Sequence, residues 1–198
     1  MRLTATRSEK YKAELRADIL TAAREIFIRD GYEGFTIRKL AKRIGFSPGN
    51  MYLYFKNKNE LFDCLVDESF ADLLAALPQP ENTTGEDPVQ LLKRSLRIYV
   101  KFGLEHPNHY RFSFLLRPAS QPRPHKQRAA YQSLLRKVQL CIQSKRFRTR
   151  DADLAAQSLW AAAHGIASLF IERPKFPWVG RDRLIDQVLD SAVDGLLR

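Results

Sequence analysis

Apolar residues recur every three or four positions along most of the chain, which is the period of an α-helix. No stretch alternates apolar and polar residues as a β-strand does, and no repeat of about 20 to 50 residues is visible. The first apolar series ends at Asp30-Gly31, because glycine tolerates the left-handed conformation that closes a helix. The pattern predicts an all-α fold of about nine helices. That first series comprises Leu15, Ile19, Ala23, Ile26 and Phe27.

Two later series each predict a helix with one apolar face. The first comprises Tyr131, Leu134, Leu135, Val138, Cys141 and Ile142. We expect Arg128, Arg136, Lys137 and Lys145 to lie around the outside of that helix. The second series lies at the end of the chain and comprises Leu184, Ile185, Val188, Leu189, Ala192, Val193 and Leu196.

The segment from Leu154 to Ile171 contains no Asp, Glu, Lys or Arg, so its length touches the lower limit for a membrane span. It also contains polar residues and six alanines, so we expect a helix buried in protein instead. The N-terminal residues are charged throughout and lack the apolar core of a signal peptide. With Cys64 and Cys141 as the only cysteines, we expect a cytoplasmic protein with neither a disulfide scaffold nor a zinc site.

Residues 35–62 carry the most informative pattern, two short helices joined by a tight turn. Thr36 can cap a helix over about residues 37–44, and Gly45 can end it. Ser47 can cap the next helix, with Pro48 at the first helical position, where its missing N–H costs nothing. The spacing predicts a helix-turn-helix, whose second helix would run from about Ser47 to Tyr54 and lie in the DNA major groove.

At these residues the sequence resembles the TetR family of transcriptional regulators. The resemblance implies a helix-turn-helix DNA-binding domain over residues 1–57 and a helical domain over residues 58–198 that binds a ligand and forms a dimer. A weaker resemblance, to a Trp-His-Gly type of C-terminal domain, rests on Trp160 to Gly165 and on His106-Pro107 before Tyr110-Arg111. The family pattern is matched by Phe35-Thr36, Leu40-Ala41, Gly45-Phe46-Ser47, Gly49, Tyr52, Tyr54-Phe55, Lys58, Glu60-Leu61 and Phe62.

We expect Met51 and Phe55, four residues apart, to face the core of this domain, which leaves their neighbours facing DNA. Tyrosine hydroxyls can donate to phosphates, asparagine can pair with adenine, and leucine can cover a thymine methyl. Arg38 matches a family position that reaches a guanine, and Lys58 lies at a helix N-terminus that favours phosphate. Each group could alternatively belong to a solvated surface. The expected DNA-binding residues are Thr36, Arg38, Ser47, Pro48, Gly49, Asn50, Tyr52, Leu53, Tyr54 and Lys58.

The resemblance also implies a small-molecule site between helices of the second domain. Aromatic residues at helical spacing are more often plain core, and His164 is the polar group that best fits a ligand contact. The candidate pocket residues are Tyr99, Phe102, Phe112, Tyr131, Trp160 and His164.

Two wide apolar faces, over about residues 151–172 and 181–197, suggest that two copies of the chain pair as a four-helix bundle. Such a dimer would present two recognition helices about 34 to 36 Å apart and would bind a pseudo-palindromic operator. The expected interface residues are Leu159, Ile166, Leu184, Ile185, Val188, Leu189, Ala192 and Leu196.

Charge supports a polyanionic partner, because the formal net charge is +11. The segment Arg2 to Lys12 is basic and predicts either a solubilising tail or an arm that reaches DNA. Residues 106–150 hold 11 Lys or Arg and no Asp or Glu. That block fits a solvated helix face, the mouth of a site for an anionic effector such as an acyl thioester or carboxylic acid, or a second nucleic-acid surface.

The sequence contains no nucleophile elbow, P-loop, dinucleotide glycine motif or metal-ligand spacing, so neither catalysis nor a metal or cofactor is expected. The resemblance implies a homodimeric repressor that a small-molecule effector releases from its operator. Two alternatives stay open: an activator, and a DNA-bound structural or nucleoid-associated protein without an effector.

Overall fold

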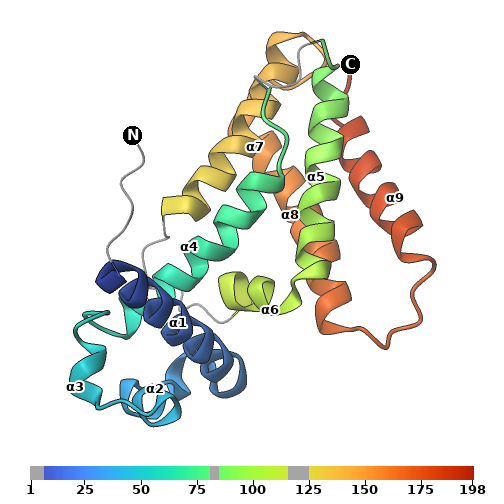
Figure 1. Ribbon diagram of the computed structural model, residues 1–198. Coiled ribbons are helices and arrows are strands. Elements are labelled where there is room, and N and C mark those ends of the chain that lie inside the picture. The colour runs from blue at the N-terminus through green and yellow to red at the C-terminus, as the bar shows by residue number, and fades with distance from the viewer. Residues whose placement is uncertain (1–6, 81–84, 116–124) are drawn as a thin grey trace. The chain divides into compact units, whose positions relative to one another are not determined.

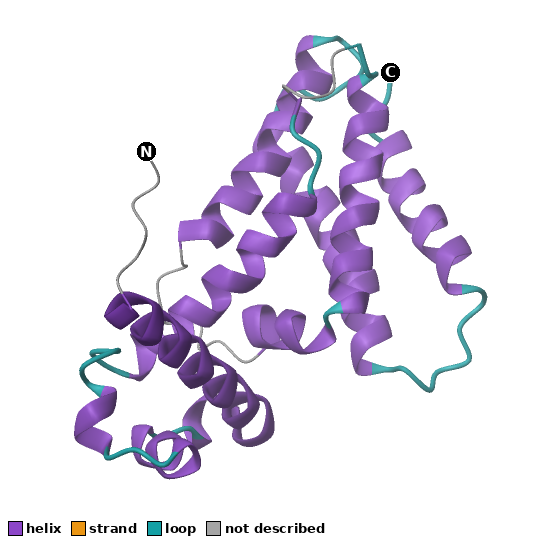
Figure 2. Ribbon diagram, viewed as in Figure 1, coloured by secondary structure: helices purple, strands orange, loops and turns teal. Residues whose placement is uncertain are grey.

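The computed structural model describes residues 7–80, 85–115 and 125–198, and Figures 1 and 2 show that its regular elements are helices. The described ranges contain nine α-helices and one short π-helix, which confirms the all-α prediction. The chain divides into two compact units. Of the described residues, 7–69 and 110–115 form the N-terminal unit, and 70–80, 85–109 and 125–198 form the C-terminal unit. The division falls within α4, whereas the predicted domain boundary follows residue 57.

The N-terminal unit contains α1 (Arg7–Gly34), α2 (Ile37–Ile44), α3 (Pro48–Met51), the first part of α4 (Lys58–Ala76) and the π-helix η2 (Arg111–Leu115). Gly31 has a φ of 73°, so the helical conformation is interrupted at the expected glycine. Of the basic N-terminal segment, residues 2–6 lie outside the described residues. Residues 7–12 are helical, so this part of the segment is the start of α1 and not a tail.

Aromatic rings form the centre of the N-terminal unit. The rings of Phe27 and Phe35 stack with centroids 3.9 Å apart, and Phe62 meets Phe27 edge-on at 5.1 Å. These rings come from α1, from the two-residue link between α1 and α2, and from α4, so the cluster holds α1 and α4 together beside the helix-turn-helix.

The C-terminal unit is built around α5 (Pro88–Glu105), which packs against α7 (His125–Gln143), α8 (Ala152–Glu172) and α9 (Arg181–Asp194). α8 also packs against α7 and α9. The short α6 (Pro107–Tyr110) follows α5. Near the C-terminus an isolated β-bridge joins Phe147 to Leu197.

α8 corresponds to the uncharged segment and is long and apolar enough to cross a membrane by length and composition alone. Its buried side chains face the neighbouring helices of the C-terminal unit, which makes it a core helix, as expected. Those buried residues are Ala155, Ala156, Leu159, Ala163, Ile166, Ala167, Phe170 and Ile171.

The buried face of α7 differs from the expected one. Lys137 is only 1% exposed, and its ammonium donates to the Ser133 hydroxyl over 2.8 Å. Val138 and Cys141 are buried as expected, whereas Tyr131, Leu134, Leu135 and Ile142 are half-buried. Placing Lys137 on the outside of the helix was wrong, because the helix turns the side that carries Ser133 and Lys137 inward.

Ion pairs join α5 to α9 within the C-terminal unit. Arg97 bonds Asp186 at 2.6 Å and Asp190 at 3.0 Å, and Lys93 bonds Asp190 at 3.1 Å and Asp194 at 2.7 Å. The acidic residues are spaced four apart on α9, so one side of that helix is committed to α5.

Candidate nucleic-acid interface

The helix-turn-helix is fixed by local hydrogen bonds that the sequence predicts. The Thr36 hydroxyl accepts a hydrogen bond from the Lys39 backbone N–H over 3.2 Å at the start of α2. Gly45 ends α2 with a φ of 74°, and the Ser47 hydroxyl then accepts from the Asn50 N–H over 3.3 Å, with Pro48 opening α3. Both caps and the glycine stop are confirmed, and they set the angle between the two helices.

The second helix is shorter than the sequence predicts. α3 ends at Met51, and residues 52–54 form turns. The backbone N–H groups of Tyr52, Leu53 and Tyr54 each donate to the carbonyl three residues back, so the chain tightens like a 3₁₀-helix. Met51 and Phe55 are 1% and 2% exposed, which confirms that both face the core.

Most of the residues predicted to contact DNA are exposed on residues 48–54, which we call the contact segment. Tyr52 is 57% exposed and Leu53 is 80% exposed, although large apolar side chains are usually buried. Tyr54 is half-buried, so less of its side chain is accessible to DNA than the sequence predicts. Pro48, Gly49 and Asn50 are exposed.

The four cations of α2 fall into two pairs. Lys39 donates to Asp30 over 3.0 Å and Arg43 pairs with Glu25, so both are tied to carboxylates of α1. Hydrogen bonds from Arg29 and Lys39 hold the pKa of the Asp30 carboxyl far below its ordinary value.

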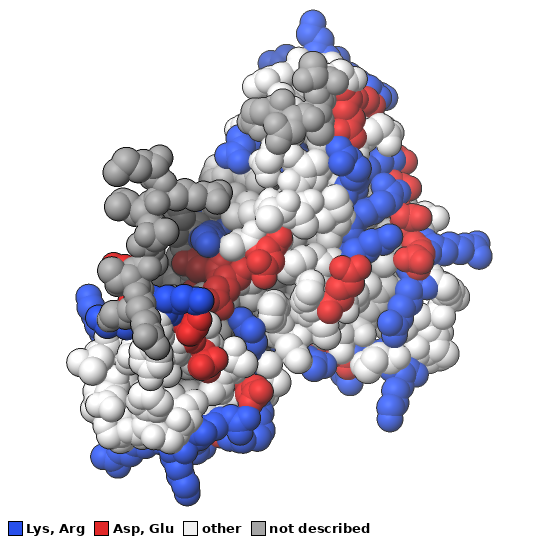
Figure 3. Space-filling view, viewed as in Figure 1, with Lys and Arg blue, Asp and Glu red and all other residues white. Residues whose placement is uncertain are grey.

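The other two cations of α2, Arg38 and Lys42, lie four residues apart on the same side of the helix and are exposed. No hydrogen bond or ion pair joins either side chain to another residue within the described ranges. Figure 3 shows Lys and Arg side chains gathered over α2. Arg38 is therefore accessible to DNA, and its contact with a guanine stays a prediction, whereas Lys42 is a second accessible cation that no sequence motif indicated.

Lys58 is the first residue of α4, as the sequence predicts, but its ammonium is not fully exposed. It lies 3.9 Å from the centroid of the Tyr32 ring, and the side chain is half-buried. Two hydrogen bonds cap the N-terminus of α4 at this point. The Glu60 N–H donates to the Asn57 side chain over 2.9 Å, and the Lys56 N–H donates to the Glu60 carboxylate over 2.6 Å.

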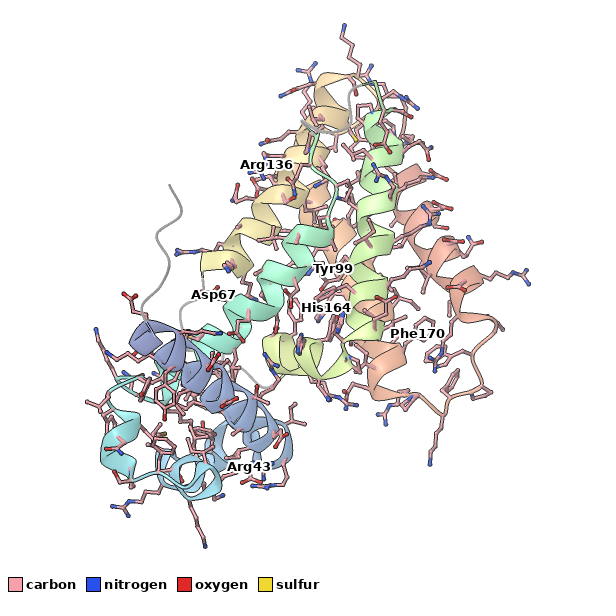
Figure 4. All side chains as sticks on the ribbon, in the orientation of Figure 1. Arg43, Asp67, Tyr99, Arg136, His164 and Phe170 are labelled. Atoms are coloured by element: carbon pink, nitrogen blue, oxygen red, sulfur yellow. The ribbon has the colours of Figure 1, made fainter. Side chains whose placement is uncertain are left out.

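Three of the candidate pocket residues meet within the C-terminal unit. Figure 4 shows Tyr99 of α5 and His164 of α8 pointing toward one another, and the Tyr99 hydroxyl lies 3.2 Å from Nδ1 of His164. Trp160 donates its Nε1–H to the same hydroxyl over 3.3 Å. All three residues are half-buried, and burial lowers the pKa of His164 from its ordinary value.

The remaining pocket candidates are arranged differently. The Tyr131 ring lies 6.3 Å from that of Trp160, and its hydroxyl donates to Asp153 over 3.0 Å. Phe102 packs on the ring of His106 at 4.7 Å. Phe112 belongs to η2 in the N-terminal unit, and its side chain lies outside the described part of the structure, so its place in the pocket stays a prediction.

Half of the predicted dimer residues are part of the protomer's own core. Leu159, Ile166, Ile185 and Leu189 are at most 5% exposed, so the expectation that they face a second copy is corrected. Their helices, α8 and α9, pack against each other and against α5. The apolar spacing in the sequence marks a buried face, but it does not say whether the same chain or a second copy covers that face. The other four, Leu184, Val188, Ala192 and Leu196, are half-buried.

A capped helix-turn-helix with an exposed contact segment and flanking cations defines the N-terminal unit as the DNA-binding part of a regulator. Two family models match the chain: "Bacterial regulatory proteins, tetR family" over residues 19–65 and "Tetracyclin repressor-like, C-terminal domain" over residues 92–196. The chain belongs to the tetR family of bacterial transcriptional regulators, which are not enzymes. Within this family, ligand-responsive DNA binding is the general activity.

Individual relatives agree with this assignment. The HTH-type transcriptional activator FasR of Mycolicibacterium smegmatis is 28% identical over 93% of this chain and 80% of its own length. The fatty acid metabolism regulator protein of Bacillus subtilis is 29% identical over 42% of this chain and 44% of its own length. A Rhodococcus sp. RHA1 protein of unknown function has the same fold, with a TM-score of 0.75 and 23% identity over 93% of this chain and 96% of its own. The more specific resemblance to a Trp-His-Gly type of C-terminal domain stays a prediction.

Proposed function

We propose that the protein is a cytoplasmic repressor that binds a pseudo-palindromic operator as a homodimer and leaves it when a small molecule binds. Residues 1–57 would form the DNA-binding domain, which Lys58 at the start of α4 would assist, and residues 58–198 would form the dimer and hold the effector. The observation that carries the DNA contact is the exposure of Tyr52 and Leu53 beside the cations Arg38 and Lys42. An exposed aromatic and an exposed leucine on a rigid, capped turn are costly in water but suit a DNA groove.

The chemistry of the exposed segment assigns a role to each side chain. Asn50 would pair with an adenine edge, Leu53 would cover a thymine methyl, and Arg38 would reach a guanine. The Tyr52 hydroxyl and the Lys58 ammonium would bind phosphates. Gly49 would allow the backbone to approach DNA closely, and Tyr54 would contact DNA at the edge of the interface. The residues at the two helix starts, Thr36, Ser47 and Pro48, would hold the contact segment in place.

The dimer would use the sides of α8 and α9 that the protomer leaves uncovered. On α8, Leu154 is 63% exposed and Leu169 is 48% exposed, with Ala161 exposed between them. On α9, the half-buried residues Leu184, Val188 and Ala192 follow at intervals of four, and Leu196 continues the same side beyond the end of the helix. Two such faces pair as a four-helix bundle, which places two contact segments on one operator.

The effector would bind at the cluster of Tyr99, Trp160 and His164, with Tyr131 and Phe102 nearby. Polar groups that converge among aromatic rings are typical of small-molecule sites. We propose an acidic molecule with an apolar chain, a carboxylic acid or acyl thioester, for two reasons. The block of residues 106–150 is basic without any acid, and one relative is named a regulator of fatty acid metabolism.

α4 links the two roles, because it begins in the N-terminal unit and ends in the C-terminal unit. An effector that favours one arrangement of α4 over another would change the spacing of the two contact segments. A loss of operator affinity of about 100-fold requires only about 2.7 kcal/mol of differential binding, which is an ordinary coupling energy.

The DNA part is tested by selecting bound duplexes from a random pool with the purified full chain. We expect an enriched motif with two inverted half-sites whose centres lie about one helical turn apart. Enrichment of no motif at all would argue for the alternative, a nonspecific DNA-bound structural protein.

The effector part is tested with a Trp178→Phe variant, which leaves Trp160 as the only tryptophan. Titration with a series of fatty acids, their coenzyme A thioesters and the matching neutral alcohols should change Trp160 fluorescence only for the acidic compounds. The same compounds should release the selected operator, whereas alcohols that act equally well would contradict an acidic effector.

Activation is the second candidate, because the relative from Mycolicibacterium smegmatis is named an activator. In vitro transcription from a promoter that contains the selected operator separates the two: a repressor lowers transcript yield, and an activator raises it.

A further inference from the structure

We propose that Tyr32 positions the Lys58 ammonium for a DNA phosphate, although Tyr32 is itself too buried to contact DNA. This inference rests on the proposed DNA contact of Lys58. It adds a residue of α1 to the determinants of operator affinity.

The Tyr32 ring is held in place from several sides. It is 8% exposed, meets the ring of Phe62 edge-on at 4.9 Å and stacks against Phe27 at 5.9 Å. Its hydroxyl donates a hydrogen bond to the side chain of Asn59, the residue that follows Lys58. The ring therefore has a fixed position relative to the first turn of α4.

The Lys58 ammonium lies over the face of this ring, 3.9 Å from its centroid. The negative face of an aromatic ring attracts a cation within about 6 Å of its centroid. A lysine at the first position of a helix is otherwise poorly placed, because the N-terminal end of the helix carries a partial positive charge. The ring offsets this repulsion and keeps the ammonium beside the start of α4.

A phosphate prefers the same location. The start of a helix attracts anions, so a DNA phosphate near α4 would meet both the helix end and the Lys58 ammonium. A free lysine loses rotamer freedom when it binds, and a lysine already held against a ring loses less. Tyr32 thus supports the contact by ordering Lys58 before DNA arrives.

The test is a double-mutant cycle on operator affinity, measured on the full chain with the selected duplex. Tyr32→Leu removes the ring, Tyr32→Phe keeps the ring but removes the hydroxyl, and Lys58→Ala removes the cation. We expect Tyr32→Leu to weaken binding about two- to fivefold when Lys58 is present and to have no effect in the Lys58→Ala background. Tyr32→Phe should bind like the original chain.

Substitution of a buried residue can also weaken DNA binding by destabilising the fold, so a spectroscopic measurement must accompany the double-mutant cycle. The ε-CH₂ protons of Lys58 should show an upfield ring-current shift in the NMR spectrum of the free protein and of Tyr32→Phe. Both proteins keep the aromatic core, so this measurement does not depend on whether Tyr32→Leu folds.

Equal losses from Tyr32→Leu with and without Lys58, or ε-CH₂ protons at their random-coil position, would overturn the positioning role while the DNA contact of Lys58 stands. If Lys58→Ala alone leaves operator affinity unchanged, the proposed contact of Lys58 fails and the role of Tyr32 fails with it.

Discussion

The Tyr99 hydroxyl lies 3.2 Å from Nδ1 of His164 and also accepts the indole N–H of Trp160. The Tyr99 hydroxyl can donate to Nδ1 or accept from it, according to the tautomer of the His164 ring. In the tautomer that carries its proton on Nε2, the ring offers an effector a hydrogen-bond donor, which suits a carboxylate or thioester oxygen.

This arrangement predicts a pH dependence of stability. Burial holds the pKa of His164 below its ordinary value of 6.5, so the unfolded chain binds a proton that the folded chain resists. The stabilisation is present above about pH 6.5 and is lost as the pH falls. Urea unfolding at about pH 7.5 and about pH 5.5 should show a smaller acid-induced loss for His164→Gln than for the original chain. His106→Gln, at an exposed histidine, is the control and should behave like the original chain. An unchanged loss in His164→Gln would contradict the assignment.

Two lysines of α2 should differ in their effect on DNA binding. Lys42 is exposed, whereas Lys39 is held by Asp30 and by the carbonyl oxygen of Gly34. If Lys42 binds a phosphate, Lys42→Ala should reduce the salt dependence of log K by about 0.9 per protomer. Lys39→Ala should leave this slope unchanged and cost about 0.5 kcal/mol of stability, as an exposed ion pair does. Equal salt dependences of log K for the two variants would contradict the distinction between an accessible Lys42 and a paired Lys39.

Leu53 should recognise the methyl group of a thymine. Its side chain is 80% exposed, so Leu53→Ala should not alter the thermal unfolding midpoint. Loss of the methyl contact costs about 0.8 kcal/mol, or about a fourfold loss of affinity. Replacing each operator thymine in turn by deoxyuracil should cause the same loss at one position in each half-site, and only for the chain that keeps Leu53. A deoxyuracil scan that is flat for the original chain would rule this contact out.

A charge on the open side of α8 should separate the dimer. Ala161 is exposed between Leu154 and Leu169, and Ala161→Glu would bury an unpaired carboxylate in the proposed bundle. We expect a monomer by sedimentation velocity, with operator affinity reduced by at least about 100-fold. Gln139→Glu, at an exposed position of α7, is the matched control and should remain dimeric. A dimeric Ala161→Glu protein would place the interface elsewhere.

Local features of the interface were predictable from sequence because their causes are local. The caps at Thr36 and Ser47 and the stop at Gly45 each depend on residues within one turn. The inward placement of Met51 and Phe55 follows from helical spacing in the same way.

Features that depend on neighbouring helices were not predictable. Apolar spacing marks a face of α9 but does not say whether α5 or a second copy covers it, which is why Ile185 and Leu189 were misassigned. The same holds for Lys137, since its burial depends on how α7 is rotated. The contact of Lys58 with Tyr32 joins residues far apart in sequence and leaves no periodic signal.

The central claim is that the capped segment around Asn50 binds DNA through its exposed side chains. Fluorescence anisotropy of the full chain, titrated on the selected operator and on a scrambled duplex of equal length, tests it most directly. We predict that Tyr52→Ala weakens binding to both duplexes by a similar factor, whereas Asn50→Ala weakens operator binding by about tenfold and leaves scrambled DNA unaffected. Operator affinity that is unchanged in both variants would contradict the account.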